Sequence, residues 1–113
     1  MIETADGFAN LEEISATPGL DGLFVGPADL SIGLGLDTFA DLTDPELLRA
    51  LDAIVAAADG HGLVPGIHAP SPSDAAAMAE RGFRFVSSAV DEDLLRQAAE
   101  GAVRAARETR PAG

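Results

Sequence analysis

The chain has 113 residues, of which 47% are hydrophobic and 4% aromatic, and it contains no cysteine. This length and composition argue against disorder and predict one domain over residues 1–113. The formal net charge of −12 opposes binding to nucleic acids and to anionic membranes. No apolar run is long enough to cross a bilayer, and no secretory leader pattern is visible, so we expect a cytoplasmic protein.

Extended and helical patterns alternate along the chain. Apolar runs predict strands at residues 20–25, 63–69 and 83–89. The apolar pair before Glu3 is too short for a complete strand, so we expect a strand that has lost its beginning. The predicted helices cover residues 10–18, 29–33, 44–60, 71–81 and 91–110. This βα order predicts an α/β fold with a parallel sheet, and four such units equal half of a (β/α)8 barrel.

Polar residues mark the expected helix starts. Asn10 is followed three residues later by a glutamate, which is the spacing of a capping box. Asp44 precedes a proline and an acidic residue, a strong helix-start pattern. Ser71 or Ser73 is expected to cap the next helix, and Asp91 the last one.

Residues 22–31 form the segment around which the chain is organised. An apolar strand stops at Gly26, and Asp29 stands where a helix begins, so its neighbouring N–H groups could face an anion. In parallel α/β folds, ligands bind at this end of the strands. Glu3, 26 residues before Asp29, occupies a comparable place, ahead of an expected turn at Asp6 and Gly7. Two carboxylates at one rim suit Mg²⁺ or Mn²⁺, although spacing alone favours a simple helix-start acid and a turn acid.

Several segments of the chain resemble the HpcH/HpaI family of metal-dependent pyruvate aldolases. The similar segments are residues 2–5, 10–14, 19–31, 65–67 and 82–86. The most specific is the run G-P-A-D-L-S with a glutamate 26 residues before its aspartate. Family members are longer, so the resemblance implies the C-terminal half of a TIM (β/α)8 barrel, as a piece of a larger aldolase domain.

The resemblance implies a lyase that cleaves a 4-hydroxy-2-oxo acid to pyruvate and an aldehyde. In it, Glu3 and Asp29 would hold a divalent cation, Mg²⁺ or Mn²⁺ with Co²⁺ as a further option. Gly26, Ala28 and Asp29 would contact the pyruvate carboxylate, and His68 would lie where relatives shape the aldehyde pocket. The family's histidine base and substrate arginine belong to earlier strands, so no residue here takes those roles. We therefore expect the chain alone to be inactive.

Other polar residues have simpler interpretations. His68 could equally be a polar residue at the strand rim, and His61 is expected to be a solvated loop or C-cap residue. Ser87 and Ser88 have no nearby base in sequence, which disfavours a nucleophile. Met1 stands where close relatives often have a glutamine, which leaves the choice of aldehyde open.

There are three alternatives to an aldolase. A citrate-lyase-β-like or malyl-CoA-lyase-like enzyme would share the carboxylate pair, but Pro27 and Ala28 favour the aldolase branch. A phosphoacceptor receiver domain needs a lysine, and the chain has none. A non-catalytic half-barrel stays open.

The absence of lysine also means that this chain cannot form a Schiff base with its substrate. The resemblance further implies a homo-oligomer, with residues 92–110 at subunit contacts.

Overall fold

In the computed structural model, described for residues 1–109, parallel strands form one sheet in chain order. The strands are β1 (Gly22–Val25), β2 (Val64–His68) and β3 (Phe85–Ser87). Ile2 adds a further parallel position beside β1, where it bridges to Val25 and donates its N–H to the Phe24 carbonyl at 2.8 Å. Strands that follow one another in sequence are thus neighbours in the sheet, as in an arc of a (β/α)8 barrel. The predicted parallel α/β fold is confirmed.

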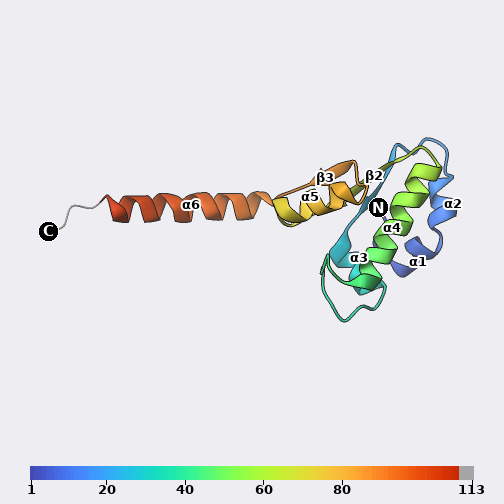
Figure 1. The fold of residues 1–113 in the computed structure, drawn as a ribbon, viewed down its shortest axis with the longest axis horizontal. Coiled ribbons are helices and arrows are strands. Elements are labelled where there is room, and N and C mark those ends of the chain that lie inside the picture. The colour runs from blue at the N-terminus through green and yellow to red at the C-terminus, as the bar shows by residue number, and fades with distance from the viewer. Residues whose placement is uncertain (110–113) are drawn as a thin grey trace.

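The helices occupy two regions of the molecule. They are α1 (Ala5–Ala9), α2 (Leu11–Ser15), α3 (Pro27–Gly33), α4 (Pro45–Gly60), α5 (Pro72–Glu80) and α6 (Asp91–Glu108). The first five lie beside the sheet, whereas α6 projects away from it, and the molecule measures 69 × 31 × 20 Å (Figure 1). Arg110, expected in the last helix, lies outside the described residues. None of the helices in the described part is long and apolar enough to cross a membrane.

Two predicted helix starts are confirmed by their hydrogen bonds. The Asp44 carboxylate accepts the N–H groups of Glu46 and Leu47 at 2.7 and 3.2 Å. Of the two serines proposed to cap α5, Ser71 takes this role, because its hydroxyl accepts the Asp74 N–H at 3.2 Å. These bonds satisfy donors that a helix start leaves without intrahelical partners.

Three predictions for the helix starts are wrong. Asn10 occupies the cap position of α2, but its amide donates to the Asp6 carbonyl instead, so no capping box forms. The expected turn at Asp6 and Gly7 lies within α1, because Thr4 accepts the Gly7 N–H and starts a helix earlier than predicted. The cap position of α6 is residue 90, and the Asp91 carboxylate accepts an N–H within the first turn.

The strands are shorter than predicted, and β2 and β3 start later because the first residues of their apolar runs close the preceding helices. The Phe83 N–H donates to the Met78 carbonyl at the end of α5, and the Leu63 N–H donates to the Ala58 carbonyl at the end of α4. Both residues are buried but do not belong to the sheet. The strands therefore begin one or two residues after the apolar run does.

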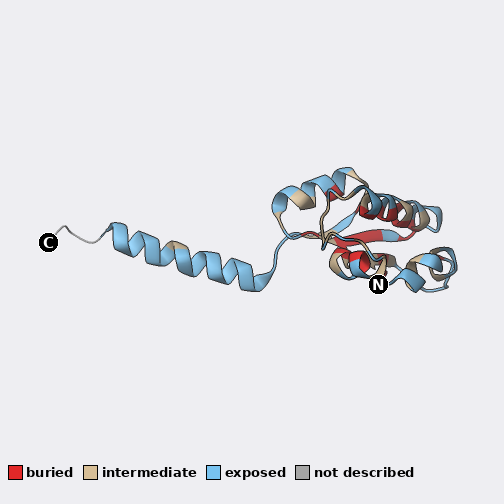
Figure 2. Cartoon of the chain, turned by 90° about the horizontal axis from the view of Figure 1, so that it is seen from below, coloured by how far each residue is buried: buried red, intermediate tan, exposed pale blue. Residues whose placement is uncertain are grey.

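The core lies between one face of the sheet and the helices. Leu23, Val25 and Ile67 point from the strands to this side, and α4 contributes the largest set of buried side chains. That set is Leu47, Ala50, Leu51, Ile54, Val55 and Ala58, which recur at helical spacing. Figure 2 shows the buried residues gathered between the sheet and the helices, and none of them on α6.

The opposite, inner face of the sheet is apolar and open to solvent within residues 1–109. The rings of Phe24 and Phe85 meet edge to face, with centroids 5.9 Å apart. Gly66 lies between them in the strand register, and a Cβ there would be 2.8 Å from the Phe24 ring. Phe85 is 62% exposed. Together with Val64, these residues line a shallow hollow of about 360 Å³.

Candidate functional site

The strand register brings four residues together at the carboxyl ends of the strands. One row across the sheet consists of Ile2, Val25, Ile67 and Val86. The residues that follow them turn to the inner face, because successive side chains of a strand point to opposite faces. We call this group the rim layer, and it consists of Glu3, Gly26, His68 and Ser87.

The Glu3 side chain lies directly over Gly26. A Cβ on Gly26 would lie 2.5 Å from Glu3 Oε1 and 3.2 Å from its Cγ and Cδ, so any larger residue would displace the carboxylate. Helix α3 also fits closely here, since a Cβ on Gly33 would lie 3.0 Å from the Glu3 carbonyl oxygen. Two glycines thus hold Glu3 between the end of β1 and helix α3.

Asp29 stands in the first turn of α3, three residues after Gly26, and is exposed. The N–H groups of Ala28 and Asp29 have no acceptor within the helix, because they belong to its first turn. Buried Ser31 holds this turn in place: its hydroxyl donates to the Ala28 carbonyl at 2.7 Å and accepts the Ala40 N–H at 3.2 Å. The motif serine therefore secures the turn that carries Asp29.

Glu3 and Asp29 thus flank the same strand-to-helix turn. Both offer carboxylate oxygens, the hard donors that Mg²⁺ and Mn²⁺ prefer. The part of the chain that the structure describes contains no group of three or more metal-binding side chains. Two carboxylates suit Mg²⁺, which usually retains several waters or substrate oxygens. The donor set therefore fits such a cation, and metal binding itself stays a prediction.

His68 lies in the rim layer, at the end of β2. Its Nδ1 is 2.8 Å from the Ser87 hydroxyl oxygen on β3. Its other ring nitrogen, Nε2, has no hydrogen-bond partner among residues 1–109, and it is not fully buried. Nε2 is therefore accessible, and contact with a substrate stays a prediction for this residue.

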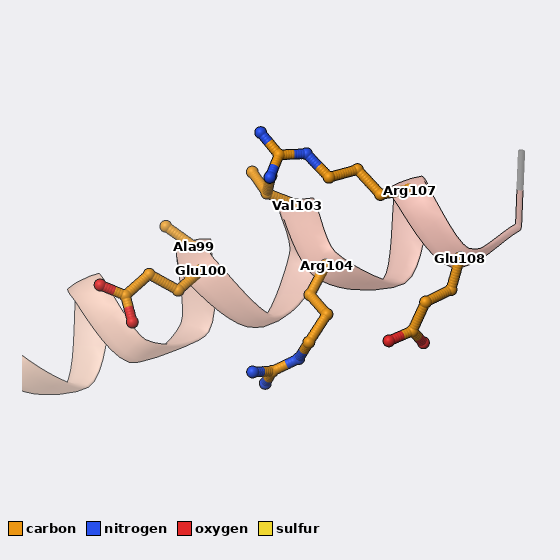
Figure 3. A pocket seen from close by; sticks show the side chains of 6 residues that line it. All are labelled: Ala99, Glu100, Val103, Arg104, Arg107 and Glu108. Carbon is orange, nitrogen blue, oxygen red and sulfur yellow. The ribbon is translucent and has the colours of Figure 1, made fainter.

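His61 and the surface of α6 are not parts of this site. His61 follows α4 at the other end of the sheet, as the predicted C-cap residue, and its Nε2 lies 2.8 Å from a Glu12 carboxylate oxygen. A hollow on α6 is lined by six residues of that helix alone (Figure 3). Its residues are Ala99, Glu100, Val103, Arg104, Arg107 and Glu108. One helix presents a single wall and cannot enclose a ligand.

Residues 1–98 match the family described as HpcH/HpaI aldolase/citrate lyase. The chain belongs to this family. An HpcH/HpaI relative, the hydroxypyruvate/pyruvate aldolase of Chromohalobacter salexigens, is 42% identical over 98 residues, which cover 87% of this chain and 38% of the relative. The 5-keto-4-deoxy-D-glucarate aldolase of Klebsiella pneumoniae is 41% identical over 99 residues, covering 88% and 38%.

The fold is that of the HpcH/HpaI barrel. A crystal structure of an HpcH/HpaI aldolase/citrate lyase family protein from Burkholderia cenocepacia is similar with a TM-score of 0.81 and 36% identity. The match covers 94% of this chain and 40% of that one. The chain therefore spans less than half the length of these relatives, and the parallel βα units predicted from the sequence are confirmed as part of a TIM barrel.

Ser87 has a role in the site that its sequence context does not indicate. It is disfavoured as a nucleophile, but its hydroxyl binds the His68 ring. A signal was present: Ser87 stands two residues after Phe85, and His68 two after Gly66, at equivalent positions of consecutive strands. The register that makes them partners follows from the folded sheet.

Proposed function

We propose that the chain supplies the cation-binding rim of a cytoplasmic carbon–carbon lyase that cleaves a 4-hydroxy-2-oxo acid to pyruvate and an aldehyde. The observation that carries this proposal is the position of the Glu3 carboxylate, which lies over Gly26 beside the turn that presents Asp29. The aldolase names of both curated relatives support this branch of the family over the citrate lyases.

In this proposal, Glu3 and Asp29 hold Mg²⁺ or Mn²⁺, or alternatively Co²⁺. Such a cation would act as a Lewis acid that stabilises the negative charge developing on the 2-oxo acid as the carbon–carbon bond breaks. Gly26 contributes by leaving room for the Glu3 carboxylate. Ser31 contributes by holding the turn on which Asp29 stands.

The remaining rim residues bind the organic substrate. The N–H groups of Ala28 and Asp29 face outward from the start of α3 and can donate to the pyruvate carboxylate. His68 faces the inner side of the sheet and would contact the aldehyde half. We assign no residue of this chain as the general base.

The proposal is tested in the full-length protein by removing either carboxylate. Glu3→Gln and Asp29→Asn should each lower retro-aldol turnover by orders of magnitude and lower the bound Mn²⁺, because one charged ligand is lost. Glu13→Gln, at an exposed position on α2, is the matched control and should change neither quantity. Near-normal turnover and metal content in both site variants would refute the assignment.

A second measurement tests the class of mechanism. An imine mechanism requires a lysine amine, and this chain contains none. A chelator should therefore abolish turnover, and borohydride with pyruvate should leave no covalent adduct on the full-length protein. Turnover that resists the chelator, together with a reduced pyruvyl adduct, would favour the imine route.

We also propose that the protein is a homo-oligomer in which α6 packs on another subunit. The support is the exposure of the apolar residues of α6, including Leu95, which is 73% exposed. Leu95→Glu should lower the mass measured by sedimentation, because a charge would replace an apolar contact. Gln97→Glu, a charge change on the same helix, is the control. An unchanged mass for Leu95→Glu would contradict this contact.

A further inference from the structure

We propose that Ser87 positions the His68 ring so that its Nε2 recognises a hydroxyl group on the aldehyde half of the substrate. Ser87 is thus a positioning residue and His68 the group that touches the ligand. This inference rests on the proposed function, because it assigns a preference to that same site. It names the class of aldehyde: a hydroxyaldehyde in preference to an apolar aldehyde of equal size.

The first step is the fixed geometry of the pair. His68 and Ser87 are register partners on neighbouring strands, and the residues before them, Ile67 and Val86, are paired as well. One residue after His68, the Ala69 N–H donates to the Ser87 carbonyl at 2.8 Å. Both side chains therefore rise from a hydrogen-bonded part of the sheet, and the 2.8 Å contact joins Nδ1 to the hydroxyl oxygen. A ring held at one nitrogen has a defined direction for the other.

The second step is the chemical state of Nε2. A neutral imidazole carries its proton on one nitrogen, and the partner of the other nitrogen selects which. When the Ser87 hydroxyl donates to Nδ1, Nε2 keeps its hydrogen and becomes a donor. When Ser87 accepts from Nδ1, Nε2 becomes an acceptor. A substrate hydroxyl can serve either state, because it both donates and accepts.

The third step is the surroundings of Nε2. The layer beneath the rim layer is formed by the rings of Phe24 and Phe85, with Gly66 between them. Within residues 1–109, the side chains of this layer offer no hydrogen bond to a ligand. In the rim layer above them, Glu3 is assigned to the cation and Ser87 is bound to His68, which leaves Nε2 for the aldehyde half. A hydroxyaldehyde satisfies Nε2, whereas an apolar aldehyde removes it from water without a partner. One neutral hydrogen bond of this kind corresponds to roughly a tenfold preference.

The test compares glycolaldehyde with propanal, in which a methyl group replaces the hydroxyl group. Condensation with pyruvate is measured as kcat/KM for each aldehyde in the full-length protein. The wild type should prefer glycolaldehyde roughly tenfold, and His68→Phe and Ser87→Ala should each lose that preference. Ser87→Thr keeps the hydroxyl and should retain it. Ser88→Ala, at the exposed neighbouring serine, is the control. A Ser87→Ala variant with the full preference would overturn the proposal.

Two further readouts separate this inference from the proposed function. Exchange of the pyruvate methyl protons in deuterium oxide needs no aldehyde, so it should occur in the wild type and in the control variant Ser88→Ala. Its absence in the wild type would count against the proposed lyase. The nitrogen NMR signals of the His68 ring report its tautomer without any turnover. Ser87→Ala should shift them and Ser87→Thr should not, and unchanged signals in Ser87→Ala would refute the positioning role.

Discussion

Replacing Gly26 by alanine should weaken cation binding without weakening the fold. The backbone of Gly26 is extended, with φ −95° and ψ 97°, which alanine adopts without strain. The added Cβ, however, would lie 2.5 Å from Glu3 Oε1, and ordinary contacts begin at 3.4 Å. The carboxylate oxygen must therefore move by about 0.9 Å. Because this oxygen ends a flexible side chain, it can move at little cost to the rest of the structure.

The expected effects on stability and on function have opposite signs. Alanine reduces the freedom of the unfolded chain, which stabilises a protein by about 0.4–1 kcal/mol at a compatible position. Displacing a ligand should lower metal affinity by about 10- to 100-fold, as loss of the groups that orient ligands does. Misplacement by roughly 1 Å can also lower turnover by about 100-fold.

The assay combines calorimetric titration with Mn²⁺, in the absence of substrate, and thermal unfolding of the same variant. Leaving substrate out separates the shift of Glu3 from any contact between the new methyl group and the ligand. Gly60→Ala is the control, because a Cβ there has no neighbour within 4 Å. In a Glu3→Ala background, Gly26→Ala should have no further effect on Mn²⁺ binding. Unchanged Mn²⁺ affinity in the single Gly26→Ala variant would refute the reasoning.

Three further predictions concern the fold. Leu51→Ala, which empties a fully buried position on α4, should lower the free energy of unfolding in urea by about 2–5 kcal/mol. Ser71→Ala should lower it by about 1 kcal/mol through loss of the α5 cap, and Ser73→Ala by much less; equal losses would contradict the assigned cap. The Thr38 hydroxyl, and then N–H groups of α4, hold the pKa of Asp44 below its ordinary value of 3.8. The ionised Asp44 side chain therefore stabilises the fold fully above pH 3.8, and this stabilisation is lost as the pH falls through the lowered pKa. In urea unfolding, Asp44→Asn should therefore reduce the dependence of the free energy of unfolding on pH in the acid range.

Local patterns were enough to predict much of the fold. The helical spacing after Asp44 predicted α4 and its buried face, because capping and amphipathicity are properties of neighbouring residues. The resemblance of the run around Asp29 pointed to the rim, and the structure places Glu3 and Asp29 at one turn. In both cases the relevant signal lies within one short segment or in a fixed spacing between two segments.

What could not be predicted depends on contacts between distant segments. The position of the Glu3 carboxylate over Gly26 follows from the pairing of the first residues with β1, which no local pattern contains. The partnership of His68 with Ser87 likewise requires the strand register. A local contact was missed as well: Thr4 starts α1 where Gly7 had suggested a turn, because a capping hydroxyl outweighs the low helix propensity of one glycine.

The glycine between the two rings has an evolutionary consequence. A Cβ on Gly66 would lie 2.8 Å from the Phe24 ring, 3.1 Å from the Phe85 ring and 3.2 Å from the Phe85 carbonyl oxygen, so a larger residue at position 66 requires both rings to give way. The three positions therefore share one volume, and mutations among them should be accepted in compensating pairs. A smaller residue at position 24 or 85 would lower the floor beneath the rim layer. Under the proposed function, such a change would make room for longer aldehydes without altering Glu3 or Asp29.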